Sequence, residues 1–136
     1  MTRLITFLSA VLLTFMSVSL FAQKTKTEND FHLRKAYEAI DEKDVDKALE
    51  LVEKQLKETP NNVDALILRM RIYQGREEYG KALADINHAI KVNNPKKTDM
   101  EQSTLYWWQS YAYAGLGDDA KAAIACGTAY KLAQKE

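Results

Sequence analysis

The stretch at residues 79–91, YGKALADINHAIK, has the apolar spacing of a helix that buries one face. Ala82, Ile86, Ala89 and Ile90 stand at i, i+4, i+7 and i+8, which places them along one side of an α-helix. Two of these four residues are alanines, and small side chains allow a neighbouring helix to approach closely. The stretch therefore predicts a helix packed against others.

The same pattern recurs on both sides of this stretch at fixed spacings. The Lys-Ala pair at 81–82 also stands 34 residues earlier at 47–48 and 40 residues later at 121–122. The offset of 40 relates further identical pairs: Tyr73 and Tyr113, Gly75 and Gly115, and Ala89 and Ala129. Matches in one register over about twenty residues indicate an internal repeat.

A second helical pattern precedes each of the three repeated helices. These patterns cover residues 31–41, 65–74 and 100–114, and breaks such as Thr59-Pro60-Asn61-Asn62 and Asn93-Asn94-Pro95 separate the units. Asp44 and Asn62 are suited to cap the helices that follow them. The sequence therefore predicts an all-α fold of six helices in three antiparallel pairs.

These residues resemble the tetratricopeptide repeat (TPR) family, whose unit is a 34-residue helix–turn–helix. The middle copy carries the resemblance best, through Leu66, Met70, Tyr73, Tyr79, Ala82, Ile86, Ala89 and Pro95. The first copy departs from the family pattern at Gln55 and the third at Asp119. About six extra residues, 97–102, are expected to lengthen the first helix of the third copy. The resemblance implies a right-handed α-solenoid over residues 29–136, with repeats at about 29–62, 63–96 and 97–136.

The chain begins with a segment that does not belong to the predicted repeats. Arg3 precedes an uncharged apolar run at residues 4–21 and a small residue, Ala22, as in a secretory signal peptide. We expect a signal at residues 1–22, a flexible lead-in at 23–28, and a periplasmic or secreted protein. The alternative is a membrane anchor formed by residues 4–21.

The resemblance implies that the first helix of each pair lines a concave groove that binds a protein or a peptide. Carried over by position, the groove residues are Tyr37, Ile67, Arg71, Gln74, Trp107 and Tyr111. Helical spacing supports part of this set, because Trp107 and Tyr111 share a face opposite Tyr106 and Tyr113. The alternative is that the tryptophans fill gaps left by an alanine-rich partner helix.

The last predicted helix has a face that no later repeat covers. Leu49 and Leu83 would pack on the unit that follows them, and the equivalent position in the third copy is Ala123. Tyr130 lies on the same face. This open end favours either self-association through Ala123 and Tyr130 or a natural chain that continues into another domain, such as an enzyme.

The sequence gives no sign of catalysis, of a cofactor or of a metal site. It has 19 basic and 19 acidic residues, and this zero balance argues against nucleic acid as a partner. Cys126 stands between Ala122 and Ala129 on an apolar stripe, so we expect a buried thiol. The leading hypothesis is thus an exported, non-catalytic TPR scaffold that binds a protein or peptide, and the alternatives are an assembly subunit and the N-terminal part of a longer enzyme.

Overall fold

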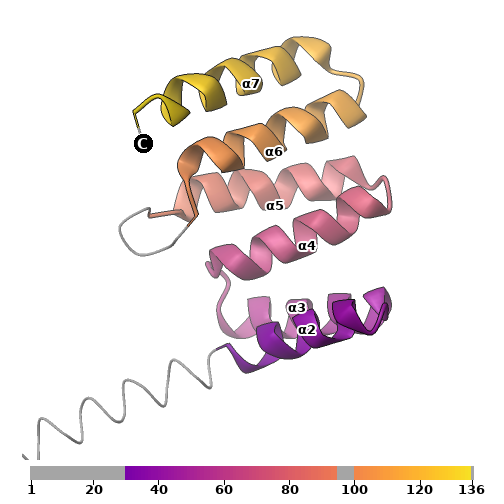
Figure 1. Cartoon of the computed structure of the whole chain (residues 1–136). Coiled ribbons are helices and arrows are strands. Elements are labelled where there is room, and N and C mark those ends of the chain that lie inside the picture. The colour runs from indigo at the N-terminus through magenta and orange to yellow at the C-terminus, as the bar shows by residue number, and fades with distance from the viewer. Residues whose placement is uncertain (1–29, 95–99, 136) are drawn as a thin grey trace, which may run out of the picture. The chain divides into compact units, whose positions relative to one another are not determined.

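In a computed structural model the described residues are 30–94 and 100–135, and they form six α-helices and no strand (Figure 1). The predicted all-α class is confirmed. The helices are α2 (Phe31–Asp41), α3 (Val45–Glu58), α4 (Val63–Gly75), α5 (Tyr79–Val92), α6 (Gln102–Gly115) and α7 (Asp119–Ala133). The predicted signal peptide, its lead-in and the alternative anchor lie outside the described residues.

Within residues 32–136, which form one compact unit, consecutive helices from α3 to α7 contact one another in chain order. The core is centred on α4, which buries residues on several sides because α3 and α5 both pack against it. Leu66 and Met70 of α4 and Ile86 of α5 are almost completely buried. Across the same interface, Arg69 holds the buried carboxylate of Asp85 with two hydrogen bonds of 2.8 and 2.7 Å.

The three turns that join α2 to α3, α4 to α5 and α6 to α7 have one geometry. Each contains a residue with positive φ: Lys43 at 62°, Glu77 at 59° and Gly117 at 75°. These positions are separated by 77 − 43 = 34 and 117 − 77 = 40 residues, the offsets of the sequence repeat. The next amide in each turn donates to a carbonyl five residues earlier, at 2.8 to 2.9 Å, which is the hydrogen bond of a Schellman motif.

The first helix pair is joined by Gln55, the residue that departs from the TPR pattern. Its side chain is fully buried and accepts a hydrogen bond from the amide of Leu33 in the first turn of α2 at 3.1 Å. It also donates to the hydroxyl of Thr59, the C-cap of α3, at 2.8 Å. A polar residue is stable here because it satisfies a helix terminus that would otherwise be buried without a partner.

The third pair differs from the prediction at the start of its first helix. α6 begins at Gln102 rather than at Met100, and at 14 residues it is only one longer than α4. Asn93 donates from its side chain to the carbonyl of Met100 at 3.1 Å, and Gln102 donates to the carbonyl of Ile90 at 3.1 Å. Both bonds hold the chain against the end of α5, so Met100 precedes the helix instead of extending it.

The prediction that Cys126 is buried is wrong. Its thiol is exposed, and the side of α7 that faces the protein contains Ala125 and Ala129. α7 is apolar on nearly every side, so the helical period alone does not select the packed face. The neighbouring helix α6 selects it by contact.

Candidate binding surfaces

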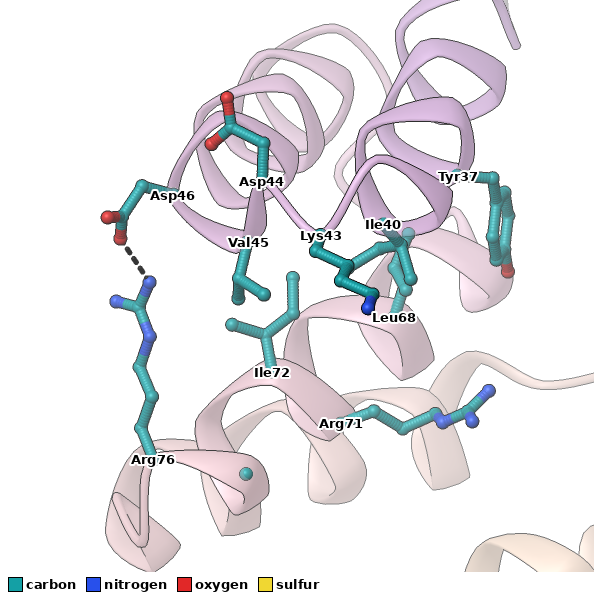
Figure 2. A pocket seen from close by; sticks show the side chains of 11 residues that line it. Tyr37, Ile40, Lys43, Asp44, Val45, Asp46, Leu68, Arg71, Ile72 and Arg76 are labelled. Atoms are coloured by element: carbon teal, nitrogen blue, oxygen red, sulfur yellow. Dashed lines mark hydrogen bonds and ion pairs between the residues drawn. The ribbon is translucent and has the colours of Figure 1, made fainter.

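A hollow of about 760 Å³ lies between α2, the α2–α3 turn and α4; we call it the α2–α4 hollow. Its apolar lining comes from Ile40, Val45, Leu68 and Ile72. Figure 2 shows Val45 and Ile72 facing each other, with Tyr37 at one end of the group. The volume is in the range of pockets that hold small ligands or several side chains of a partner.

Charged groups surround this apolar lining, and two of the cations have no ion-pair partner among the described residues. Arg76 pairs with Asp46, as the dashed line in Figure 2 marks. Asp44 caps α3 by accepting a hydrogen bond from the amide of Lys47 at 3.0 Å. Lys43 and Arg71 form no ion pair within residues 30–94 and 100–135.

Tyr37 is partly buried at the edge of the hollow and has an altered acidity. Burial raises the pKa of its hydroxyl above the usual value, and the negative charge of Asp64 raises this pKa further. The positive charge of Arg71 acts in the opposite direction. Tyr37 and Arg71, both predicted from the sequence, therefore lie in one electrostatic environment.

Four aromatic rings form a second surface, which we call the aromatic cluster: Tyr79, Trp107, Trp108 and Tyr111. The Trp107 ring meets Trp108 edge-on at 4.8 Å between centroids and stacks on Tyr111 at 6.5 Å. Tyr111 also meets Tyr79 of α5 at 6.4 Å. Trp107 is 50% exposed and Tyr111 49%, whereas Trp108 packs partly against the core.

A smaller hollow of about 350 Å³ lies between α6 and α7; we call it the α6–α7 hollow. It joins Trp107 of the aromatic cluster to Tyr130 and Cys126 on α7. Tyr130 is 68% exposed and Ile124, on the same helix, is 70% exposed. Ala123 is also exposed, so the two residues predicted for the open end are both accessible.

The structure brings the predicted groove residues together only in pairs. Tyr37 and Arg71 share the α2–α4 hollow, and Trp107 stacks on Tyr111. Ile67 and Gln74 are buried, at 7% and 8% exposure, and they offer little surface to a partner. The side-chain nitrogen of Gln74 is buried without a hydrogen-bond partner in the described part of the chain.

Lys43 and Val45 line a hollow that the sequence reasoning missed. That reasoning assigned the groove to the first helix of each pair, and these residues belong to the turn and to the second helix. The available signal was the repeated turn itself, which begins at Glu42, directly after α2. Val45 is apolar and comes directly after the capping residue Asp44, which indicates that its side chain is held near the preceding helix.

The described residues define an all-α protein whose accessible features include the α2–α4 hollow, the α6–α7 hollow and the aromatic cluster. Among them, no group of three or more metal-ligating side chains comes together. Within the same residues, no helix has the length and hydrophobicity needed to span a membrane. A comparison with protein-family models and with curated proteins found no match for this chain.

Proposed function

We propose that this protein is an exported, non-catalytic scaffold of the TPR type that binds a protein or peptide partner through the aromatic cluster. In this proposal the three helix pairs continue into a right-handed superhelix, with α2, α4 and α6 on its concave side. The apolar leader at residues 4–21 supports export to the periplasm or the exterior.

The exposure of Trp107 and Tyr111 is the observation that carries the proposal. A folded chain gains free energy by burying such rings, and here two stacked rings each leave about half of their surface in water. Large aromatic side chains that are rigid and partly exposed are also the residues that dominate binding energy at interfaces. Stacking within the cluster fixes the rings before a partner arrives, which lowers the entropy cost of binding.

The test is capture of partners by the purified protein from the envelope fraction of its source cells. The double variant Trp107→Ala and Tyr111→Ala should lose the captured protein while keeping its helical circular dichroism. Leu116→Ala is a matched control, because Leu116 is also 50% exposed but is not part of the cluster. Unchanged capture by the double variant would contradict the proposal.

A second candidate function is self-assembly through α7. Tyr130 and Ile124 are more exposed than any other large apolar side chain of the described residues. On α3 and α5 the corresponding faces are covered, since Leu49, Leu83 and Ile90 pack against the core. A second copy that covered α7 would bury these residues in the same way.

Light scattering distinguishes this candidate from the first. Self-assembly predicts a dimer or a larger species for the wild type and a monomer for Tyr130→Glu. Lys91→Glu makes a comparable change of charge on α5 and should leave the assembly intact. A wild-type monomer at high concentration would exclude assembly through α7.

A further inference from the structure

The α2–α4 hollow combines an apolar lining with two cations, Lys43 and Arg71, that form no ion pair with a described acid. Three cations, Lys43, Arg71 and Arg76, line it together with two carboxylates, Asp44 and Asp46. Asp46 is paired with Arg76, and Asp44 accepts a hydrogen bond from the amide of Lys47 while it keeps its negative charge. Three cations and two carboxylates leave the lining with a net charge of 3 − 2 = +1, and Lys43 and Arg71 are the cations without an ion pair.

The two available cations lie on different elements of the hollow. Lys43 belongs to the α2–α3 turn, and Arg71 belongs to α4. Figure 2 shows the Lys43 side chain extending from the turn toward α4, close to Leu68. In the same view Val45 and Ile72 lie on the other side of Lys43 from the Arg71 guanidinium, so a ligand that reached both cations would lie beside this apolar pair.

We propose that the α2–α4 hollow binds an acidic segment of the partner protein, in which an aliphatic or aromatic side chain stands beside carboxylates. The apolar side chain enters between Val45, Leu68 and Ile72, and the carboxylates pair with Lys43 and Arg71. This inference rests on the proposed binding function and adds the chemistry of the partner. The guanidinium of Arg71 suits a carboxylate with two parallel hydrogen bonds, and the Lys43 ammonium acts as a point charge.

The shape of the hollow favours a peptide over a small molecule. The hollow is open to solvent, so the backbone of a bound segment keeps its contact with water while one or two side chains are buried. Its volume of about 760 Å³ accommodates the one or two side chains that such a segment would bury. A partner with a lysine or arginine next to its apolar residue is disfavoured, because the cation would face Lys43 and Arg71.

The experiment is a selection of random twelve-residue peptides displayed on phage against the immobilised full chain. Binding of the selected peptides, synthesised with a fluorescein label, is then measured by fluorescence anisotropy. We expect peptides in which Asp or Glu flanks Leu, Ile or Phe, with an affinity that weakens as salt is added. Lys43→Gln and Arg71→Gln should each weaken binding about tenfold, the loss expected for a hydrogen bond to a charged group.

Matched variants separate this hollow from other basic or apolar surface. Lys54→Gln removes an exposed lysine of α3 that pairs with Glu50, and it should leave binding unchanged. Val45→Thr replaces one methyl group by a hydroxyl at nearly constant shape and should weaken binding about threefold. Lys43→Gln and Arg71→Gln remove the charge and shorten the side chain while keeping it polar, and circular dichroism checks that each variant remains folded.

The outcomes separate this inference from the broader proposal. Selected peptides without acidic residues, or acidic peptides indifferent to Lys43→Gln and Arg71→Gln, would overturn the inference. If those peptides instead lost affinity with Trp107→Ala, the scaffold function would stand without an acidic site. A selection that yields no binding peptide would count against both.

Discussion

Gly115 at the end of α6 lies directly against the ring of Tyr79 at the start of α5. A Cβ atom added to Gly115 would be 2.4 Å from Cδ1 of Tyr79 and 2.6 Å from its Cγ, well inside van der Waals contact. The Tyr79 ring in turn contacts Tyr111. The absence of a side chain at residue 115 thus positions one ring of the aromatic cluster.

We therefore predict that Gly115→Ala destabilises the protein by about 1–3 kcal/mol, the usual cost of overpacking. The Tyr79 ring must move, because the clash includes Cγ near the base of its side chain. Chemical denaturation measures the loss, and near-ultraviolet circular dichroism should report a rearranged aromatic cluster.

The matched control for this change is Gly75→Ala. Gly75 is the last residue of α4 and stands at the equivalent repeat position, but nothing lies within 4 Å of an added Cβ. Alanine there should leave stability unchanged or raise it slightly. Equal effects of the two changes would contradict the close approach of α6 to Tyr79.

The turns give a prediction with opposite signs at equivalent positions. The backbone of Glu77 is in the left-handed region, which is unfavourable for every residue with a side chain. Glu77→Gly should therefore stabilise the protein by about 0.5–1 kcal/mol. Position 117 already has glycine, which adopts this conformation without strain. Gly117→Ala should therefore destabilise the protein by about 1 kcal/mol. Urea unfolding at constant m-value is the measurement.

A glycine within a helix, Gly80, provides a control for the general effect of replacing glycine by alanine. Gly80 lies within α5, has no positive φ and has open space around its α-carbon, so Gly80→Ala should not destabilise. A loss of stability at Glu77→Gly would show that the turn between α4 and α5 does not share the geometry of the turn at Gly117.

The acidity of Tyr37 tests the electrostatics of the α2–α4 hollow. Its pKa should lie above the ordinary value of about 10. Because Asp64 raises this pKa and Arg71 lowers it, Asp64→Asn should decrease it and Arg71→Gln should increase it. NMR titration of tyrosine labelled with ¹³C at Cζ measures the change, with Tyr37→Phe to assign the signal.

The same shift fixes the sign of a dependence of stability on pH. A pKa raised by folding means that the folded state retains its proton longer than the unfolded state. The contribution of Tyr37 to stability is complete below the unfolded pKa and is lost as pH rises through the folded pKa. A wild-type Tyr37 that titrates below the ordinary value would contradict this environment.

Cys126 should react in the native protein because its thiol is exposed. We predict that a disulfide reagent such as Ellman's reagent labels it without denaturant, at a rate close to that in urea. Cys126 and Trp107 line the same hollow, so labelling should also change the tryptophan fluorescence. If the thiol reacted only after unfolding, Cys126 would be buried in the folded protein, as the sequence pattern predicted, and the exposed position would be contradicted.

The starts of α3 and α4 could be predicted because two local signals coincide there. The apolar period indicates the helices. α5 and α6 begin without a side-chain cap, whereas the capping residues Asp44 and Asn62 mark the starts of α3 and α4. Their side chains accept hydrogen bonds from the amides of Lys47 and Ala65 at 3.0 Å. These signals depend on residues close in sequence, so no knowledge of the tertiary structure was needed.

The faces of the helices were harder to predict, since tertiary contacts decide them. α4 has apolar residues on most of its circumference, and contacts with α3 and α5 bury Ile67 and Gln74 there. α7 has small residues on most of its circumference, so the apolar period indicates no preferred buried face. Cys126 was for this reason wrongly predicted to be buried. Trp107 and Tyr111, predicted for a groove because they share a helix face opposite Tyr106 and Tyr113, are about half exposed, and their role as binding residues stays a prediction.

The central claim is that the aromatic cluster is the contact surface for a different protein. Its most direct test is photocrosslinking in the source cells with p-benzoylphenylalanine at position 107, and with the same group at the exposed position 54 as a control. The account predicts a light-dependent adduct at position 107 that contains this chain and one other protein, and no such adduct at position 54. Adducts at position 107 that contain only a second copy of this chain, or no adduct at all, would contradict it.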